Sequence, residues 1–201
     1  MMSKVDNNPT KNVIGAETGF TLIELLVAMA AGIIVLAAII GMFSNLTQSY
    51  TTETVRASAQ QDVRSALALM CEDIIHAGLD PTGTAGSSIT TLGATDIEFT
   101  ADMNYDGDTA DNNEWVRYFL NGNELRQQIK DSTGAVTEDD VLLDNVTDLS
   151  FVYLDEDENA TTTADDVRIV QITMTIQPPA GRAGSVTRTL SQQVRLRNAL
   201  S

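Results

Sequence analysis

The chain has 201 residues, a net charge of −16 and one cysteine, Cys71. Its length suits one membrane anchor and one domain of modest size, and a single cysteine excludes an internal disulfide. A domain this acidic repels nucleic-acid phosphates and anionic membrane surfaces, so we expect no nucleic-acid partner.

The chain begins with a polar segment that is followed by a long apolar run. Residues 1–18 are polar and show no apolar periodicity, as expected of a short cytoplasmic leader. The residues from Leu25 to Phe43 carry no charge, and with Phe20–Ile23 they reach the roughly 20 residues that a membrane-spanning helix needs. We therefore expect a leader over residues 1–19 and a transmembrane helix over residues 20–43.

Glu24 is a carboxylate inside this apolar stretch, where a charge costs at least about 2.5 kcal/mol on insertion scales. No lysine or arginine lies between Lys11 and Arg56, so no nearby side chain of the same chain supplies a positive charge. A free amino group would supply one if the chain were cut before Phe20. The alternative is an ordinary amino-terminal anchor or a secretory signal with an accidental glutamate. A secretory signal would be cut after its apolar core at small residues, and residues 43–46 lack that pattern.

The sequence GFTLIE at residues 19–24, followed by an unbroken apolar helix, resembles the cleavage site of type IV prepilins and pseudopilins. The resemblance implies that a prepilin peptidase cuts after Gly19 and methylates the new amino group of Phe20. It also places Glu24 at the family's glutamate position, with a role in assembly. Residues Glu17-Thr18 depart from family leaders, which often carry a lysine or arginine directly before the glycine.

Apolar residues continue at three- and four-residue spacing beyond Phe43, which predicts an amphipathic continuation of the helix over residues 44–78. The stripe consists of Val55, Ala59, Val63, Ala66, Leu67, Met70 and Ile74. Gly78, followed by Asp80-Pro81, predicts the end of this helix near Ala77. One face of the helix is thus available to cover a domain.

Residues 79–201 are expected to form a globular β-rich domain. The Gly-, Ser- and Thr-rich segment 81–93 predicts a loop, and Asn121-Gly122 predicts a type I′ hairpin. Strand-like runs occur at residues 96–100, 115–120, 124–129, 149–154, 167–176 and 186–196. Antiparallel strands with one apolar face need a cover, which the amphipathic helix provides. The predicted fold is α+β: a long N-terminal helix packed on an antiparallel β-sheet, as in the pilin fold.

An alternation of oxygen-bearing side chains from Asp102 to Asp108, with Gly107 at the turn, resembles the opening of a calcium-binding loop. The candidate metal ligands are Asp102, Asn104, Asp106, Asp108 and Glu114, with Asp111 as a substitute at the far end. Glu114 lies one residue later than the usual bidentate position. We expect a structural Ca²⁺ ion here, and a solvated acidic turn is the alternative. A second acidic cluster, residues 155–159 with Asp165 and Asp166, lacks a glycine and predicts a solvated hairpin loop, with a metal site as the alternative.

Several later segments are similar to the PilW family of type IV pilus minor pilins, and the related J-type pseudopilins share much of the pattern. The residues that carry this resemblance are Ser65–Leu67 with Asp73 and Ala77-Gly78, followed by residues 118–127, 143–151 and 167–172. The resemblance implies a minor pilin-like subunit that helps initiate or cap a type IV pilus. The alternative is a J-type minor pseudopilin at the tip of a type II secretion pseudopilus.

The same resemblance implies the partners and the location. The partners are other major and minor pilins or pseudopilins, the prepilin peptidase and, before assembly, the inner membrane. The globular domain lies outside the cytoplasm, and the subunit then enters a pilus or pseudopilus. A membrane-anchored enzyme is a third hypothesis, but the carboxylates lie in polar loops and the one histidine, His76, lies at a helix end. We therefore expect no catalytic site.

The arginines near the C-terminus form the one basic region without interleaved acids. They are Arg182, Arg188, Arg195 and Arg197. We expect them to pair with neighbouring carboxylates and not to bind DNA.

Overall fold

The computed structural model describes residues 19–111, 113–181 and 184–197. The chain forms two compact units, Met1–Leu46 and Thr47–Ser201. The helix α1, Leu22–Ile74, begins in the first unit and ends in the second. From Leu22 to Leu46 every side chain is exposed, because none of the residues described in this unit forms an element that covers the apolar helix.

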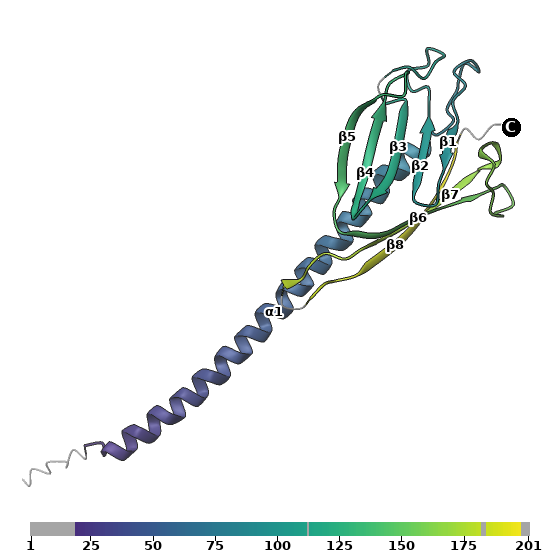
Figure 1. Ribbon diagram of the computed structural model, residues 1–201. Helices are drawn as coiled ribbons and strands as arrows, with labels where there is room; N and C mark the ends of the chain where they lie inside the picture. Colours follow the sequence, from purple (N-terminus) through teal and green to yellow (C-terminus); the bar gives the residue numbers. More distant parts are fainter. Residues whose placement is uncertain (1–18, 112, 182–183, 198–201) are drawn as a thin grey trace, which may run out of the picture. The chain divides into compact units, whose positions relative to one another are not determined.

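The second unit contains the last part of α1, eight strands and one short 3₁₀ helix, η1 (Ala164–Asp166). The strands are β1 (Ile89–Leu92), β2 (Asp96–Thr100), β3 (Trp115–Asn121), β4 (Glu124–Lys130), β5 (Val136–Leu143), β6 (Val146–Leu154), β7 (Ile169–Ile176) and β8 (Arg188–Arg195). All strand pairs are antiparallel, and they form a five-stranded sheet in the order β1-β2-β3-β4-β5 and a three-stranded sheet in the order β6-β7-β8 (Figure 1).

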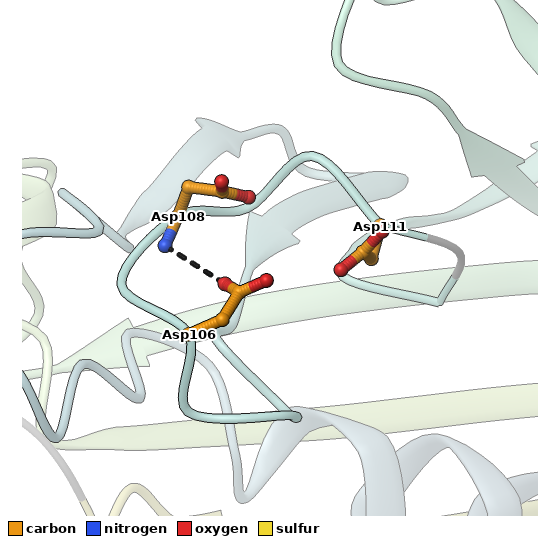
Figure 2. A group of neighbouring side chains, drawn as sticks. All are labelled: Asp106, Asp108 and Asp111. Atoms are coloured by element: carbon orange, nitrogen blue, oxygen red, sulfur yellow. Dashed lines mark hydrogen bonds between the residues drawn. The ribbon is translucent and has the colours of Figure 1, made fainter.

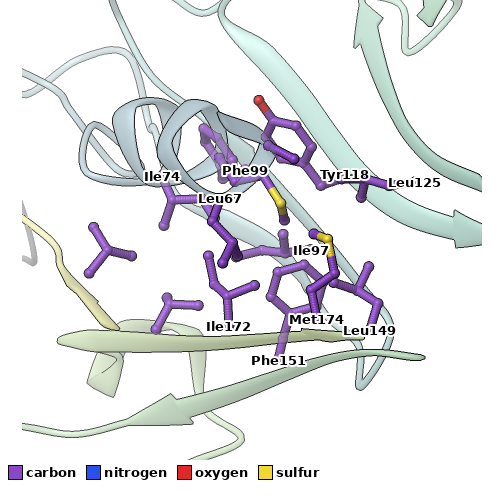
Figure 3. Packing of buried hydrophobic residues seen from close by; sticks show 14 of the residues in the cluster. Leu67, Ile74, Ile97, Phe99, Tyr118, Leu125, Leu149, Phe151, Ile172 and Met174 are labelled. Atoms are coloured by element: carbon purple, nitrogen blue, oxygen red, sulfur yellow. The ribbon is translucent and has the colours of Figure 1, made fainter. Parts of the chain in front are cut away.

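One apolar core holds the second unit together. The predicted helix stripe is buried from Ala59 to Ile74, whereas Val55 is only half-buried. Figure 3 shows Leu67 and Ile74 of the helix among side chains of both sheets, such as Ile97 and Ile172. The predicted packing of the amphipathic helix on antiparallel strands is confirmed, and burial of these side chains is the main stabilising contribution.

The strand predictions were correct for six of the eight strands and wrong for two. β1 lies within the segment predicted as a loop, and β5 was not predicted. β5 carries three consecutive acids, Glu138 to Asp140, and its side chains are mostly exposed because it is an edge strand. Its sequence therefore lacks the apolar alternation that marks a half-buried strand, while charges at a sheet edge oppose pairing with other chains.

The β3–β4 hairpin differs in detail from the prediction. Asn121 pairs with Glu124, so the loop residues are Gly122 and Asn123. Gly122 has φ +61°, and Asn123 is not among the residues of positive φ. This combination indicates a type II′ turn, and the predicted type I′ turn is wrong. The helix also ends at Ile74, three residues earlier than predicted, and continues as a turn to Gly78.

The strands form two sheets, where one was expected. Both sheets pack on the same core, and they are joined at the β1–β2 turn: the Tyr153 hydroxyl of β6 donates to the carbonyls of Gly93 (2.9 Å) and Asp96 (3.1 Å). The Phe151 amide donates to the Ala94 carbonyl at 2.9 Å. This turn therefore holds the edge of the three-stranded sheet.

Candidate functional site

The predicted cleavage position lies just outside the helix. Gly19 and Phe20 precede the first helical residue, Leu22, and both are exposed, Phe20 to 90%. The peptide bond between them is therefore not locked in helical hydrogen bonds. Glu17 and Thr18, which depart from the usual leader pattern, lie outside the described residues.

Glu24 forms a capping box with Thr21 at the start of α1. The Thr21 amide and hydroxyl both donate to Glu24 Oε2 at 2.9 Å, and the Glu24 amide donates to Thr21 Oγ1 at 3.3 Å. This reciprocal bonding satisfies amides that have no partner within the helix. Sequence reasoning gave Glu24 the amino group of Phe20 as a partner and a role in assembly, and it missed the capping box that the Thr-x-x-Glu spacing predicts.

The structure divides the predicted metal ligands into two groups. Asp102 and Glu114 are buried and hold the loop through its backbone: Asp102 accepts from the amides of Tyr105 (2.6 Å) and Gly107 (3.1 Å). Glu114 accepts from the amides of Met103 (2.9 Å) and Asp111 (3.1 Å). These two carboxylates therefore close the loop on itself.

The second group is an exposed carboxylate cluster of Asp106, Asp108 and Asp111 (Figure 2). One oxygen of each lies within 4.8 Å of the others. The Asn104 side-chain amide donates to Asp106 Oδ2 at 3.1 Å and to Asp111 Oδ2 at 2.6 Å. Asp111, the substitute considered from sequence, thus joins Asn104, Asp106 and Asp108, while Asp102 and Glu114 are not among the carboxylates that meet within 4.8 Å.

A polar triad connects the last turns of α1 to the five-stranded sheet. The Tyr118 hydroxyl of β3 donates to Asp73 Oδ2, and Gln127 Nε2 of β4 donates to the same oxygen at 3.1 Å and to the Tyr118 hydroxyl at 2.8 Å. Tyr118 and Gln127 face each other because they are paired in the β3–β4 register. Burial and the nearby Asp73 charge raise the pKa of Tyr118, so it stays a donor.

A second polar cluster surrounds Glu98 on β2. Its carboxylate accepts from Lys130 Nζ at 2.5 Å, from Trp115 Nε1 at 2.8 Å and from the Thr90 hydroxyl at 3.2 Å. Burial alone would raise the pKa of Glu98, but these hydrogen bonds and the Lys130 charge hold it below its ordinary value. The cluster joins β1, β2, β3 and β4.

The arginine prediction is wrong for three of its four members. Within the described part of the chain, Arg188, Arg195 and Arg197 form no ion pair with a carboxylate. The arginines that do pair lie elsewhere: Arg56, Arg117 and Arg126. Arg182 lies outside the described residues.

The fold places the chain in a known class. The chain is similar in structure to a type IV-like pilin from Thermus thermophilus, with a TM-score of 0.52 and 11% sequence identity. The match covers 71% of this chain and 98% of that chain. Among the described residues, one helix, α1, is long and apolar enough to cross a membrane. The class is therefore that of a pilin-like α+β protein with a long apolar N-terminal helix, as predicted.

The family follows from the sequence of the second unit. The family described as PpdB, prepilin peptidase-dependent protein B, matches residues 52–196. The chain belongs to this family. No match to the chain was found among curated protein sequences. The narrower resemblance to PilW minor pilins stays a prediction.

Proposed function

We propose that this chain is a minor pilin-like subunit of the PilW type, which helps initiate or cap a type IV pilus. In this proposal the prepilin peptidase cuts after Gly19 and methylates the amino group of Phe20. The observation that carries the proposal is the start of α1: an exposed Gly19–Phe20 bond, then a capped helix of membrane length whose side chains are all exposed up to Leu46.

An apolar surface of this extent is unfavourable in water, since each Å² costs about 25 cal/mol. It requires either lipid or other apolar helices around it. We propose that the helix first lies in the inner membrane as a single span, with the globular unit outside the cytoplasm. It then leaves the membrane to pack among the helices of other pilins in the pilus.

We propose that Glu24 directs the packing. Thr21 occupies Oε2 of the carboxylate, and among the described residues Oε1 accepts no hydrogen bond. The amino group of Phe20 from a neighbouring subunit would pair with this second oxygen. A charge that is costly to bury alone then becomes compensated at one axial position, which sets the register of the helices.

We also propose that the carboxylate cluster binds a structural Ca²⁺ ion. Hard oxygen ligands suit this cation, which would offset the repulsion between the three charges and supplies no redox chemistry. Asp106, Asp108 and Asp111 offer carboxylates. Asn104 offers Oδ1, which accepts the Asp106 amide at 2.9 Å and has a second lone pair. Asp102 and Glu114 hold the backbone of this loop in place. The alternative is a solvated acidic turn.

The second candidate function is that of a J-type minor pseudopilin of a type II secretion pseudopilus. Such a protein has the same helix and processing requirements, so the fold does not distinguish the two functions. We propose no enzymatic activity for the chain, because the polar clusters of the second unit connect strands and loops to one another.

The deciding experiment is a count of surface pili in a strain that lacks the gene, with secreted proteins assayed on the same cells. Loss of pili with normal secretion, restored by the native gene, supports the pilus subunit. Intact pili with failed secretion supports the pseudopilin. If both are normal, the proposal is overturned.

A further inference from the structure

A recess of about 320 Å³ lies beside the Asp73 triad, within the second unit. Its walls come from the last turns of α1, the five-stranded sheet and the base of the 102–114 loop, and include Leu69, Asp73, His76, Phe99, Met103 and Gln127. Leu69 and Met103 remain 37% and 45% exposed at its rim. The recess thus combines apolar walls with a small number of polar groups, as ligand pockets do.

Asp73 presents a carboxylate in a fixed orientation in this recess. Tyr118 and Gln127 both bind Oδ2, whereas Oδ1 accepts no hydrogen bond from any described residue and is not closed off from solvent. Figure 3 shows the Tyr118 hydroxyl at the margin of the apolar cluster, so the triad lies where the core meets the recess. One carboxylate oxygen is therefore held ready to accept a donor.

Among the residues that the structure describes, no lysine or arginine forms an ion pair with this carboxylate. The basic side chains of the neighbouring strands are already used: Lys130 pairs with Glu98, and Arg126 pairs with Glu124 and Asp139. Burial raises the pKa of Asp73 and the nearby Glu72 acts in the same direction, while the Tyr118 hydrogen bond and His76 oppose the change. The carboxylate is partly desolvated without a compensating lysine or arginine.

We propose that this recess binds the side chain of a lysine or arginine from a neighbouring pilin-like subunit. The aliphatic stem would lie along Leu69, Phe99 and Met103, since long basic side chains bury their methylenes against apolar surface. The charged end would donate to Asp73 Oδ1, which gives a charge-assisted hydrogen bond. The net charge of −16 also favours a basic partner. The identity of the partner rests on the proposed function.

The first test measures side-chain binding directly. The full chain, labelled with ¹³C in its methionine methyl groups and held in detergent micelles, is titrated with Nα-acetyl-lysine methylamide and with the uncharged Nα-acetyl-norleucine methylamide. Met103 at the rim reports binding, and the buried Met174 reports that the core is intact. We expect the lysine probe to bind about fivefold more tightly, the size expected of a partly exposed ion pair.

Two variants assign the preference to one carboxylate. Asp73→Asn keeps the shape of the side chain and should abolish the preference for the lysine probe. Asp62→Asn, an exposed acid on the same helix, should leave it unchanged. Equal binding of the two probes by the native chain overturns the inference without any variant. A preference that survives Asp73→Asn with an unchanged Met174 signal also overturns it.

A cellular test identifies the source of the cation. A photo-crosslinking amino acid at Leu69 should join the chain to another pilin-like subunit next to a lysine or arginine, and Asp73→Asn should reduce that product. A crosslink far from any basic residue of the partner overturns the inference. The pilus count in the deletion strain is independent of these results, so failure of the recess and failure of the proposed function are distinguishable.

Discussion

The Tyr118 hydroxyl donates a hydrogen bond to the Asp73 carboxylate, which connects β3 to α1 across 45 residues of sequence. Gln127 completes the triad from β4 and bonds both partners. Because Tyr118 is fully buried, its hydroxyl has no access to bulk water that would replace this bond.

Tyr118→Phe should lower the free energy of unfolding by about 1–2 kcal/mol, because Asp73 and Gln127 lose a partner in a partly desolvated place. Urea denaturation of the full chain in mild detergent, followed by the fluorescence of the single tryptophan, measures the change. Tyr105→Phe, at an exposed loop position, serves as the control and should have no effect. Equal stability of both variants would show that the triad contributes nothing.

Glu98→Gln should destabilise the chain by about 1–3 kcal/mol at pH 7, because it leaves Lys130 without a charge partner while the acceptor for Trp115 remains. The folded-state pKa of Glu98 lies below its ordinary value of 4.5. Its contribution is therefore complete above pH 4.5 and is lost as the pH falls through the folded-state pKa.

The pH series supplies the check on this cluster. The difference in unfolding free energy between the native chain and Glu98→Gln should shrink as the pH falls below 4.5, the ordinary pKa of the group. Glu138→Gln, an exposed acid on β5, should show no such trend. A difference that stays constant from pH 7 to pH 3 would contradict the assignment.

Gly107→Ala should destabilise the 102–114 loop by about 1–3 kcal/mol. Gly107 has φ +94°, and an added Cβ would lie 2.6 Å from Thr84 Oγ1, which itself donates to the Gly107 carbonyl. Gly122→Ala is the matched comparison, since Gly122 has φ +61° but no atom within 4 Å of the new Cβ. The Gly107 variant should lose more stability in urea denaturation; the reverse order would rule out the packing argument.

Millimolar Ca²⁺ should raise the Tm of the native chain by about 3 °C or more if the carboxylate cluster binds the ion. Asp106→Asn and Asp111→Asn should each remove the shift, and Asp157→Asn in the other acidic loop should retain it. Mg²⁺, which demands a tighter octahedral site, should give a smaller shift. No shift with Ca²⁺ would leave a solvated acidic turn as the correct interpretation.

Glu24→Ala should remain inserted in the membrane yet fall at least about tenfold in sheared pili, because the proposed pairing with a neighbouring amino group is lost. Glu24→Gln separates the two roles of the residue, since glutamine preserves the capping box but has no charge. We expect both variants to fail in assembly. Normal incorporation of Glu24→Gln would show that only the cap matters, and Glu53→Ala on the same helix controls for expression.

The sequence predicted the parts of the fold that have a regular apolar pattern. The apolar stripe of the helix from Ala59 to Ile74 could be predicted because its spacing matches one helical face. The alternation of apolar residues from Val170 to Ile176 predicted β7. β5 could not be predicted from an apolar pattern. It is an edge strand with mostly exposed side chains, so acidic residues are tolerated there. The division into two sheets was also hidden, since alternation defines a buried face without specifying which strands pair.

The polar sites were predictable only where their members are close in sequence. The carboxylates from Asp106 to Asp111 stood out through their spacing. Asp73 lies 45 residues from Tyr118 and 54 residues from Gln127 in the sequence, so only the fold brings the three side chains together. Asp102 and Glu114 were predicted as metal ligands, but sequence could not show that loop amides donate to their oxygens.

The acidic edge strand β5 limits how this subunit can associate. A free strand edge on a stable sheet invites copies to add side by side, which leads to ribbons or aggregates. Glu138 and Asp140 place exposed acids where two such edges would meet, while Asp139 pairs with Arg126 of β4. β5 also departs twice from regular pairing with β4. Polymerisation through this sheet edge is thereby discouraged, which leaves the apolar helix surface as the one available for the proposed assembly.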